Sequence, residues 1–576
     1  MVARGQNFRQ FPLNVVGSSI FGRYPKISIE KTYNMFMSDE FMVPYSGYNI
    51  GILAENFLGS TEGRGIFTST KFDALVVVQG ANVFLVNIVF SQLSQKVIFS
   101  NVVNIGRLQT STGVVYIAEN NGTATNPPQI GISDSTAFYI YDPSQMVPFQ
   151  VVPLNFTPGY LTFHDTYFIL AASNDTFFTI PSNNSWRLSE SNNGLVWPNT
   201  SNSIGLLQTK PDNTQAVVRF PSKGNMIFVM GSIVTEAWFD TAAQLFPYQR
   251  NNQFNIDYGC LQPATVAYMD EFVVWLAQNE KSGPVILYSN GGMPKKITTD
   301  GIDYLFSTLQ DPADSQAFLY RQDGHLFYHI NFYTDNISLV YDFSTDKFYH
   351  ACDQNLNYFI ASEVAFFNNQ YYFVTKNTGN LYVFDTTITT YQDTDSLGNV
   401  ITNEIPRIRT CANIRTPDQN YQIINDIGFT IESGETDYQQ QSLGEIILIT
   451  QDRRPLITQG GFPTLVTQDE HDLIAQDGTI FIPQQNTGGT TALLIAQQMG
   501  DTGFSNLSLP HVDLSISIDG GATFGNEWAY YLPPIGHRKN RLMWWQLGIA
   551  NDFVPQFKFW GMGRFVCTQG IISTRV

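Results

Sequence analysis

Short apolar runs, each followed by a Gly, Asn or Asp turn and a second run, recur along much of this chain. Residues 73–88, "DALVVVQGANVFLVNI", show the pattern, which returns at 162–180, 225–240, 271–278, 325–343 and 369–385. A strand, a tight turn and a second strand are typical of a β-hairpin. Between residues 66 and 390 the pattern repeats about every 40 residues, in roughly six or seven units. It predicts an all-β chain with a six- or seven-bladed β-propeller-like body, and the regular spacing favours this fold over a run of β-sandwiches.

The composition also indicates a large β protein, and it limits the possible partners. A length of 576 residues predicts about two to four domains. Only 14% of the residues are charged while 14% are aromatic, and aromatic side chains suit half-buried pleated surfaces. The net charge of −18 argues against tight nucleic-acid binding, because neutralising phosphates requires Lys and Arg. It is compatible with a surface along which DNA slides without sticking.

The pattern changes near residue 390 and suggests four parts. We expect residues 1–65 to form an extended N-terminal arm that leads into a propeller at 66–390. Residues 391–435 and 508–576 should together form a C-terminal β-sandwich or platform. Between them, residues 436–507 are an inserted Gln-rich segment.

The insertion contains a short repeat at 448–478, in which a Gln follows Thr450, Thr458, Thr467 and Ala475. The repeat predicts short strands that lean on a neighbour, because an isolated small meander buries too little surface. Residues 490–500 are the best helix candidate of the chain.

The four cysteines do not form a recognisable metal or redox motif. They are Cys260, Cys352, Cys411 and Cys567, with no CxxC pair, so we expect buried free thiols. The N-terminus has no apolar h-region, and no run of 18 apolar residues occurs. We therefore expect neither a signal peptide nor a membrane-spanning segment.

Two regularly spaced pairs invite functional hypotheses. His325 and His329 would share one face of a strand and could bind a metal, but no third ligand has a fitting spacing, so two strand-surface histidines are the simpler interpretation. Arg407 and Arg409 would also share a face. They are expected either at a solvated strand edge or, if functional, in contact with a partner ring.

Residues 517–524, "SIDGGATF", resemble the Asp-box of sialidases and other β-propellers. In those families the Asp and Thr close a hairpin turn by hydrogen bonds, and an Asp at a turn readily accepts bonds from its own backbone. A glycosidase also needs two carboxylates across the scissile bond, and no pair of acids is marked out here. With no G-x-S-x-G, P-loop or G-x-G-x-x-G either, we predict no catalytic, cofactor-binding or metal-binding residues and no cofactor.

The most specific motifs follow Trp238. They are "FPYQR" at 246–250, "GC" at 259–260, "VVWL" at 273–276 and "YSNG" at 288–291, with "ITT" closing at 297–299. This stretch resembles the tail-hub, or nozzle, family of short-tailed bacteriophages, often described as packaged-DNA stabilisation proteins. "KTYNMFMSDE" at 31–40, the Arg64-Gly65 pair before the first blade and "HRKNRLMWWQLG" at 537–548 are similar to the same family. The resemblance covers most of the chain, but the Gln-rich insertion departs from the family pattern.

The resemblance implies a structural virion protein and not an enzyme. Its homo-oligomeric ring, a hexamer, would lie below the portal and the head-to-tail adaptor, and double-stranded DNA would pass through the lumen without specific binding. The ring would bear the tail needle or plug that retains packaged DNA, and would meet tailspikes or fibres. It would reside in the virion tail after assembly in the cytoplasm of the bacterial host.

In this context the stretch from Trp238 to Cys260 should be a corner between blades. Pro247 would end a strand, Arg250 would bind carbonyls or reach a neighbour, and Cys260 would be buried. The alternative function is a carbohydrate-binding or glycosidase β-propeller with an Asp-box, and a scaffold propeller for protein partners is a third. The expected lack of a signal peptide and the low similarity among blades favour the ring protein.

Overall fold

The computed structural model describes residues 9–22, 30–60, 62–91, 96–220, 223–269, 271–395, 398–415, 420–433, 510–532, 539–561 and 563–575. One compact unit comprises Met1–Thr436 and Leu507–Val576, and a second comprises Asp437–Asn506. The second unit lies outside the described residues, and so do the whole expected insertion at 436–507, the Gln repeats at 448–478 within it and the helix candidate at 490–500.

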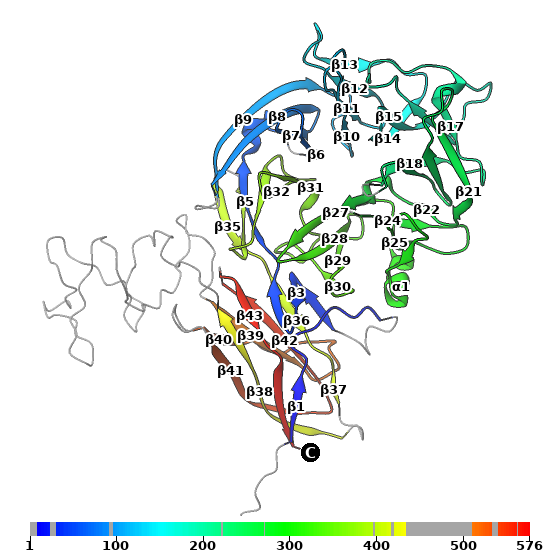
Figure 1. The fold of residues 1–576 in the computed structure, drawn as a ribbon. Helices are drawn as coiled ribbons and strands as arrows, with labels where there is room; N and C mark the ends of the chain where they lie inside the picture. Colours follow the sequence, from blue (N-terminus) through cyan, green and yellow to red (C-terminus); the bar gives the residue numbers. More distant parts are fainter. Residues whose placement is uncertain are drawn as a thin grey trace, which may run out of the picture. The chain divides into compact units, whose positions relative to one another are not determined.

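Seven antiparallel meanders form the blades of a β-propeller in the described part of the chain (Figure 1). The first three are β6 (Gly63–Ser69), β7 (Ala74–Gln79), β8 (Asn82–Ser91) and β9 (Lys96–Arg107); β10 (Tyr116–Glu119), β11 (Ile130–Ser133), β12 (Phe138–Tyr141) and β13 (Phe149–Val152); and β14 (Thr157–His164), β15 (Tyr167–Ser173), β16 (Ser185–Leu188) and β17 (Ile204–Leu206). The fourth and fifth are β18 (Thr214–Arg219), β19 (Met226–Gly231), β20 (Thr235–Asp240) and β21 (Tyr248–Ile256); and β22 (Gly259–Cys260), β23 (Ala267–Met269), β24 (Phe272–Gln278), β25 (Val285–Ser289) and β26 (Lys295–Lys296). The last two are β27 (Ser315–Gln322), β28 (His325–Phe332), β29 (Ile337–Asp342) and β30 (Lys347–His350); and β31 (Ala361–Phe367), β32 (Gln370–Thr375) and β33 (Leu381–Asp385), completed by β5 (Gly47–Ile52).

The turn residues of the sequence explain the hairpins. Asp73, Asp165, Asp323 and Asn368 lie between the first and second strands of four blades and have φ angles between 47° and 55°. Asp and Asn tolerate this left-handed conformation better than other residues with a side chain. Each therefore reverses the chain where an apolar run ends.

Apolar clusters between neighbouring blades hold the propeller together. The cluster between the first and last blades contains Ile66 and Leu75 from one and Ala365 and Phe367 from the other. Six further clusters join the remaining neighbours around the ring. The ring is therefore closed, and the predicted six- or seven-bladed propeller has seven blades.

The N-terminal region differs from the expected extended arm at 1–65. It contains β1 (Arg9–Leu13), β2 (Lys31–Tyr33), β3 (Met35–Ser38) and β4 (Phe41–Pro44), and β5 pairs with β33 as the fourth strand of the last blade. A 3-10 helix, Ala54–Phe57, then leads into the first blade. β1, β2 and β5 pair with strands hundreds of residues away and leave no hairpin pattern in the sequence, and the short β3–β4 hairpin was not recognised, so the prediction of an arm missed these strands.

A β-sandwich follows the propeller in the same unit. Its strands are β36 (Arg407–Thr410), β37 (Ile414–Arg415), β38 (Gln422–Ser433), β39 (His511–Ser517), β40 (Trp528–Tyr531), β41 (Asn540–Ala550), β42 (Asp552–Trp560), β43 (Phe565–Cys567) and β44 (Gly570–Arg575). The first sheet has the order β1-β44-β38-β43-β4-β3, with β41 on the other side of β38. The second contains β2-β36-β42-β39-β40 and continues from the sixth blade through β2 and β30.

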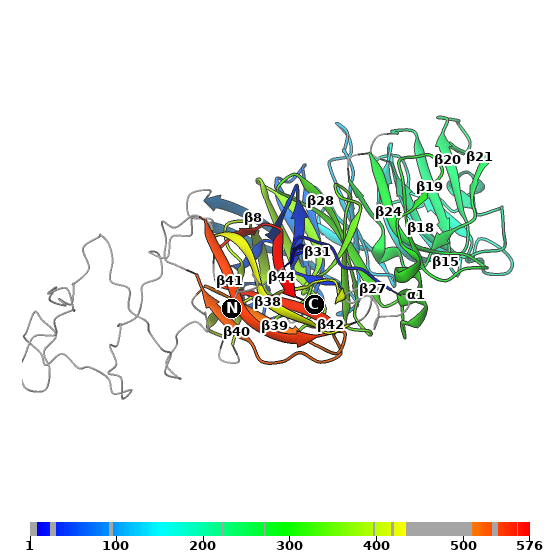
Figure 2. The ribbon, with the colours of Figure 1, turned by 90° about the horizontal axis from the view of Figure 1, so that it is seen from below.

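The two sheets face each other across one core (Figure 2). Phe429 of the first sheet lies 5.0 Å, centroid to centroid, from Phe557 of the second. Within the region expected for the sandwich, β34 (Thr390–Thr394) and β35 (Val400–Glu404) join the last blade through β5 instead. Across the described ranges, no helix combines the length and the apolar character needed to cross a membrane, and α1 (Asp300–Thr308) is the α-helix that they contain.

Candidate functional site

The stretch that begins at Trp238 forms the outer half of the fourth blade and the entry to the fifth. Pro247 directly precedes β21, whereas β20 already ends at Asp240, so Pro247 starts a strand and does not end one. Cys260 is fully buried in the cluster between these blades, as the sequence predicts. Arg250 binds a carboxylate, that of Glu236, with 3.2 Å between the Arg250 Nη1 and Glu236 Oε1 atoms.

Glu236 organises this region, although no motif in the sequence marks it. Its carboxylate is fully buried and accepts hydrogen bonds from the backbone N–H groups of Gln208 (2.8 Å) and Thr209 (2.6 Å). It also accepts one from the Trp238 indole at 3.0 Å. Side chains alternate along the strand "TEAWFD", so Glu236 lies on the same face as Trp238. An acid on the face of a large aromatic residue is the sequence signal that could have predicted a buried carboxylate. The site ties the fourth blade together.

The Asp-box motif forms the predicted turn, between β39 and β40. The Asp519 carboxylate accepts from the backbone N–H groups of Ala522 and Thr523, both at 3.0 Å. The hydroxyls of Ser517 and Thr523 also donate to it, each at 2.6 Å. These hydrogen bonds hold the pKa of Asp519 well below its usual value. All its partners belong to the turn itself, so the motif has a structural role here.

Arg409 anchors the N-terminal segment and does not lie at a solvated edge. β36 pairs with β2 on one side and β42 on the other, and the Arg409 side chain is fully buried. Its guanidinium donates to the backbone carbonyls of Asn14, Val15 and Ser18, each at 3.0 Å, and pairs with Glu30 at 2.7 Å. The expected exposed strand edge is therefore wrong for this residue.

Arg407 is also buried, with 2% of its surface exposed. It donates to the carbonyl oxygens of Thr389 (2.6 Å) and Gly561 (3.2 Å), which links the chain after the last blade to the sandwich. Burial lowers its pKa to about 10. Since both arginines are enclosed by their own chain, neither is available for the expected contact with a partner ring.

His325 and His329 are buried, which corrects the expectation of strand-surface histidines. His325 Nδ1 lies 2.9 Å from an Asp342 carboxylate oxygen. His329 lies between the rings of Phe318 and Phe359, with both centroids 4.8 Å away, and burial lowers its pKa to about 3. The two side chains are packing elements of the sixth blade and its neighbour.

Arg64, of the Arg64-Gly65 pair that resembles the phage family, stabilises the loops at the start of the propeller. It is 3% exposed and donates to the carbonyl oxygens of Gly80 (3.0 Å), Thr110 (2.9 Å) and Gly113 (2.6 Å). These acceptors lie in the loops around the first blade and before the second. A guanidinium suits the site because it presents several donors in a fixed geometry.

Two tyrosines on the first strands of neighbouring blades pack toward other blades of the propeller. The first strand of each blade borders the axis, and successive first strands contact one another. The Tyr116 and Tyr160 rings, from the second and third blades, lie 4.8 Å apart. Both also pack against the cluster between the fourth and fifth blades, which contains Val273 and Trp275. These contacts bring side chains of the second and third blades against the cluster between the fourth and fifth blades.

Glu363 also faces the axis region, from the last blade. Its Oε2 atom accepts a hydrogen bond from the backbone N–H of Ile66 in the first blade at 3.1 Å, so this bond spans the closure of the ring. Burial raises the pKa of the Glu363 carboxyl to about 8. In the sequence, this buried carboxyl could have been predicted from the single acid in the apolar strand "ASEVAFF".

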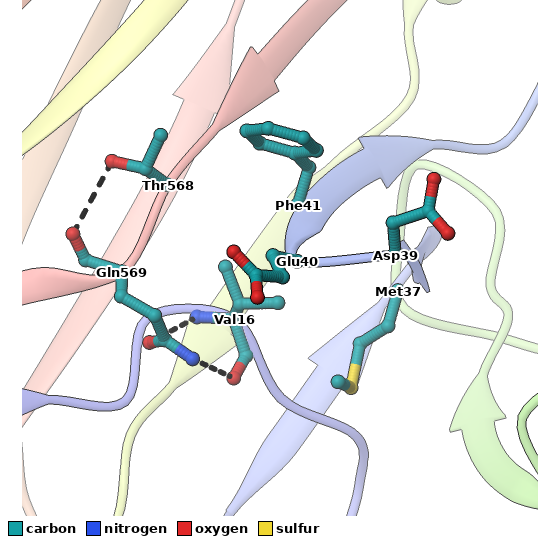
Figure 3. A pocket seen from close by; sticks show the side chains of 7 residues that line it. All are labelled: Val16, Met37, Asp39, Glu40, Phe41, Thr568 and Gln569. Atoms are coloured by element: carbon teal, nitrogen blue, oxygen red, sulfur yellow. Dashed lines mark hydrogen bonds between the residues drawn. The ribbon is translucent and has the colours of Figure 1, made fainter.

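A pocket of about 510 Å³ opens on the first sheet of the sandwich (Figure 3). It lies where the turn at 568–569 separates β43 from β44, beside the β3–β4 turn. Gln569 closes one side by bonding both backbone groups of Val16, each at 3.2 Å. Asp39, Glu40 and Phe41 form the exposed rim. An apolar floor with two carboxylates at the rim suits a basic or aromatic protein side chain better than an anionic ligand.

The described residues contain no group of three His, Cys, Asp or Glu side chains placed to hold a metal ion. The four cysteines are free and buried, as predicted. Burial raises the pKa of Cys352 and of Cys411 to about 12, so these thiols stay protonated at neutral pH.

The propeller matches a known family. Residues 164–389 match the family model described as "Bacteriophage P22 Gp10, beta-propeller", from the end of the first strand of the third blade to just past the last strand of the seventh meander. Fold and match together define a β-propeller structural protein of a bacteriophage. Over these residues the chain matches the Phage_stabilise family model, and this match confirms the resemblance to the packaged-DNA stabilisation proteins of short-tailed phages.

Other comparisons add little. A search of curated proteins gives no match. Among solved structures, an extracellular domain of a one-component system from B. thetaiotaomicron is 10% identical over 63% of this chain and 46% of its own, with a TM-score of 0.35. The N-terminal domain of Nup159 is 11% identical (60% of this chain, 96% of that one, TM-score 0.34), and an inactive virginiamycin B lyase from Staphylococcus aureus is 8% identical (56%, 95%, 0.36). Likeness at this level carries no argument about function.

Proposed function

We propose that this chain is the tail-hub, or nozzle, protein of a short-tailed phage, and that six copies form the ring through which DNA leaves the particle. The match of the propeller to the packaged-DNA stabilisation family carries the proposal. Tyr116 and Tyr160 pack between blades and not around an open bore, which supports a DNA path outside the single propeller. The lumen would lie between copies.

The proposed partners are the adaptor and portal rings above the hub, the needle or plug that it bears, and tailspikes or fibres beside it. The protein would act in the virion tail after assembly in the host cytoplasm. The lumen should be acidic or neutral, because the net charge is −18 and a basic lining would bind phosphates and slow the DNA.

We further propose that the role is structural and not catalytic. The buried ion pairs and the Asp-box each find their partners inside the fold, which supports a scaffold over a glycosidase. We also propose the domain organisation that the sequence suggests. The propeller and the sandwich form the body of the protein, and residues 436–507 are inserted into it.

Particles made without this protein test the proposal. Heads should fill with DNA and then lose it, so the DNA recovered after nuclease treatment should fall while the amount of capsid protein stays constant. Supplying the chain in trans should restore protected DNA. Stable, full particles without the protein would contradict the function.

A further inference from the structure

The outer face of the first sandwich sheet is apolar where an exposed sheet should be polar. Its outward positions hold Ile423 (42% exposed), Trp545 (61%), Ile549 (59%) and Ile571 (44%), with the half-buried Met543 among them. We call these five residues the apolar face. An antiparallel sheet with one solvated face normally alternates apolar inward and polar outward.

The strand register shows that these side chains are neighbours. Ile423 of β38 lies directly opposite Ile549 of β41, and residues directly opposite each other share a face. Ile571 of β44 lies opposite Gly428, and a Cβ built on Gly428 would come within 2.1 Å of the Met543 sulfur, so Met543 lies over this glycine. Ile571, Met543 and the isoleucine pair thus form one continuous surface across β44, β38 and β41, strands that are labelled in Figure 2.

A buried acid lies on β38, between the positions of Ile423 and Gly428. Asp426 lies opposite both Trp545 and Ser573, and it is only 7% exposed although it points outward. Its carboxylate accepts from the Ser573 hydroxyl at 2.8 Å. The aromatic and aliphatic neighbours already shield this polar group from water before any partner binds.

The opposite sheet of the same sandwich carries polar residues at its outward positions. On β39 and β42 these are Asp513 opposite Lys558 and Ser515 opposite Gln556, and Asp513 and Ser515 are buried. The two sheets therefore differ, and the difference marks the first sheet as an interaction surface, since exposed apolar patches of this kind are typical of protein interfaces.

Charges beside the apolar face indicate what covers it. Arg541 and Arg575 point outward next to it, opposite Thr430 and Ile423, and both are exposed. Among the described residues no ion pair engages either arginine, Asp39 or Glu40. Glu432 is an exposed acid at the far end of β38.

The complementary surface lies on the same chain. Asp39 and Glu40 project at the rim of the pocket in Figure 3, next to Phe41, which is 42% exposed. The two arginines beside an apolar surface and the two carboxylates beside a pocket with an apolar floor, all without an ion pair among the described residues, make the chain complementary to itself. Contacts between two different surfaces of the same chain generate a ring where the rotation between copies closes.

We propose that the apolar face packs against a second copy of this chain, with the Asp39–Glu40 turn of one copy facing Arg541 and Arg575 of the other. The inference deepens the proposed ring and rests on it. Assembly in solution tests the interface, whereas DNA retention tests the function, so the two can fail separately.

The first experiment measures self-association of the full chain by sedimentation velocity over a wide concentration range. A W545Q/I549T variant should dissociate at least about tenfold more readily than the wild type, because central aromatic anchors dominate interfaces. An M146Q/L245Q variant is the matched control, since Met146 and Leu245 are 100% and 73% exposed on propeller loops. Equal association of all three proteins, or a wild type that stays monomeric throughout, would overturn the proposal.

The second experiment identifies the contacting surfaces. R541E/R575E and D39K/E40K variants should each associate at least about tenfold more weakly than the wild type, and an equimolar mixture should regain mixed oligomers through the reversed charges. These are surface changes, so melting temperatures should match the wild type. Weak association without recovery on mixing would show that the face meets something other than the turn of another copy, and a lowered melting temperature of the monomer would show that the face is covered by its own chain.

Discussion

At the scale of single residues, buried charged groups tie the structure together, and most of them were not evident from the sequence. Arg64, Arg409 and Glu236 each satisfy several backbone groups that loops leave unpaired. The sequence shows a charged residue in an apolar run, but not which distant carbonyl or N–H group it meets. Burial of the cysteines could be predicted because they lie far apart in the sequence. Burial of His329 could not be predicted, because the spacing of two histidines says nothing about the neighbouring blade that covers them.

Replacing Glu236 by alanine should destabilise the propeller by about 3 kcal/mol, because the variant leaves Arg250 and two buried backbone donors without an acceptor. Glu280→Ala is the control, since Glu280 makes a long surface pair with Lys210 at 3.7 Å and should cost well under about 1 kcal/mol. Chemical denaturation followed by tryptophan fluorescence measures both. Equal stabilities of the two variants would contradict this role of Glu236.

Glu363 predicts a pH dependence of stability. Its folded pKa of about 8 lies above the ordinary value of 4.5, so the folded state holds a proton that the unfolded state releases. Its contribution is therefore fully present below pH 4.5 and is lost as the pH rises through 8. The Glu363→Gln variant has no group to titrate at this position, so its free energy of unfolding should lack this part of the pH dependence. At pH 8 it should be more stable than the wild type by about 1–3 kcal/mol.

Denaturation midpoints at several pH values from about 5 to about 8 measure this effect, and the difference between the two proteins isolates Glu363 from other titrating groups. Tyr116, Tyr160 and Tyr333, which lie nearby, have raised pKa values and stay neutral in this range. Parallel pH profiles of variant and wild type would show that the carboxyl is ionised in the fold.

At the scale of strands and turns, local chemistry was predictable and remote pairing was not. Hairpins marked by Asp or Asn turns were found because the strand, the turn and the next strand are contiguous. The Asp-box turn was found for the same reason. By contrast, β5 lies more than 300 residues from β33, and β1 lies more than 500 from β44. No local pattern encodes such pairs, so the N-terminal region was predicted as an arm.

Tyr48 tests the closure of the last blade by β5. Its ring is 2% exposed and lies 5.3–6.1 Å from the rings of Phe359, Phe373, Tyr382 and Tyr391. Tyr48→Ala should cost about 3–5 kcal/mol, as for other large buried aromatics. Val400→Ala, on the exposed strand β35, should have little effect. Limited proteolysis should cut the Tyr48 variant within the last blade, and resistance equal to that of the Val400 variant would contradict closure by β5.

Asp519→Ala tests the turn between β39 and β40. The variant should lower the melting temperature by about 2–4 °C at about pH 7. Because the folded pKa of Asp519 is depressed, its contribution is present above about pH 4 and is lost as the pH falls, so the two proteins should converge in acid. Glu527→Ala, which removes an exposed partner of Lys558, is the control. An Asp519→Ala variant with the melting temperature of the wild type at neutral pH would contradict a structural role of the motif.

At the scale of the whole molecule, the propeller and sandwich form one body because β2 joins a sheet of each and β5 completes the last blade. The all-β class and the propeller could be predicted, since they depend on a period that the sequence displays. The contact between Tyr116 and Tyr160 could not be predicted, because it depends on which residues of the first strands point inward at the same level. In the proposed function DNA passes between copies, so assembly of the ring is essential to it.

A cryo-electron microscopy reconstruction of the virion tail would show directly whether this chain forms the proposed ring. We expect a ring of six copies below the adaptor, with DNA on the ring axis, no density through any single propeller, and the apolar face of each sandwich covered by a neighbouring copy. A tail in which this chain occupies peripheral positions away from the DNA path, or a virion that lacks the chain, would contradict the proposed function.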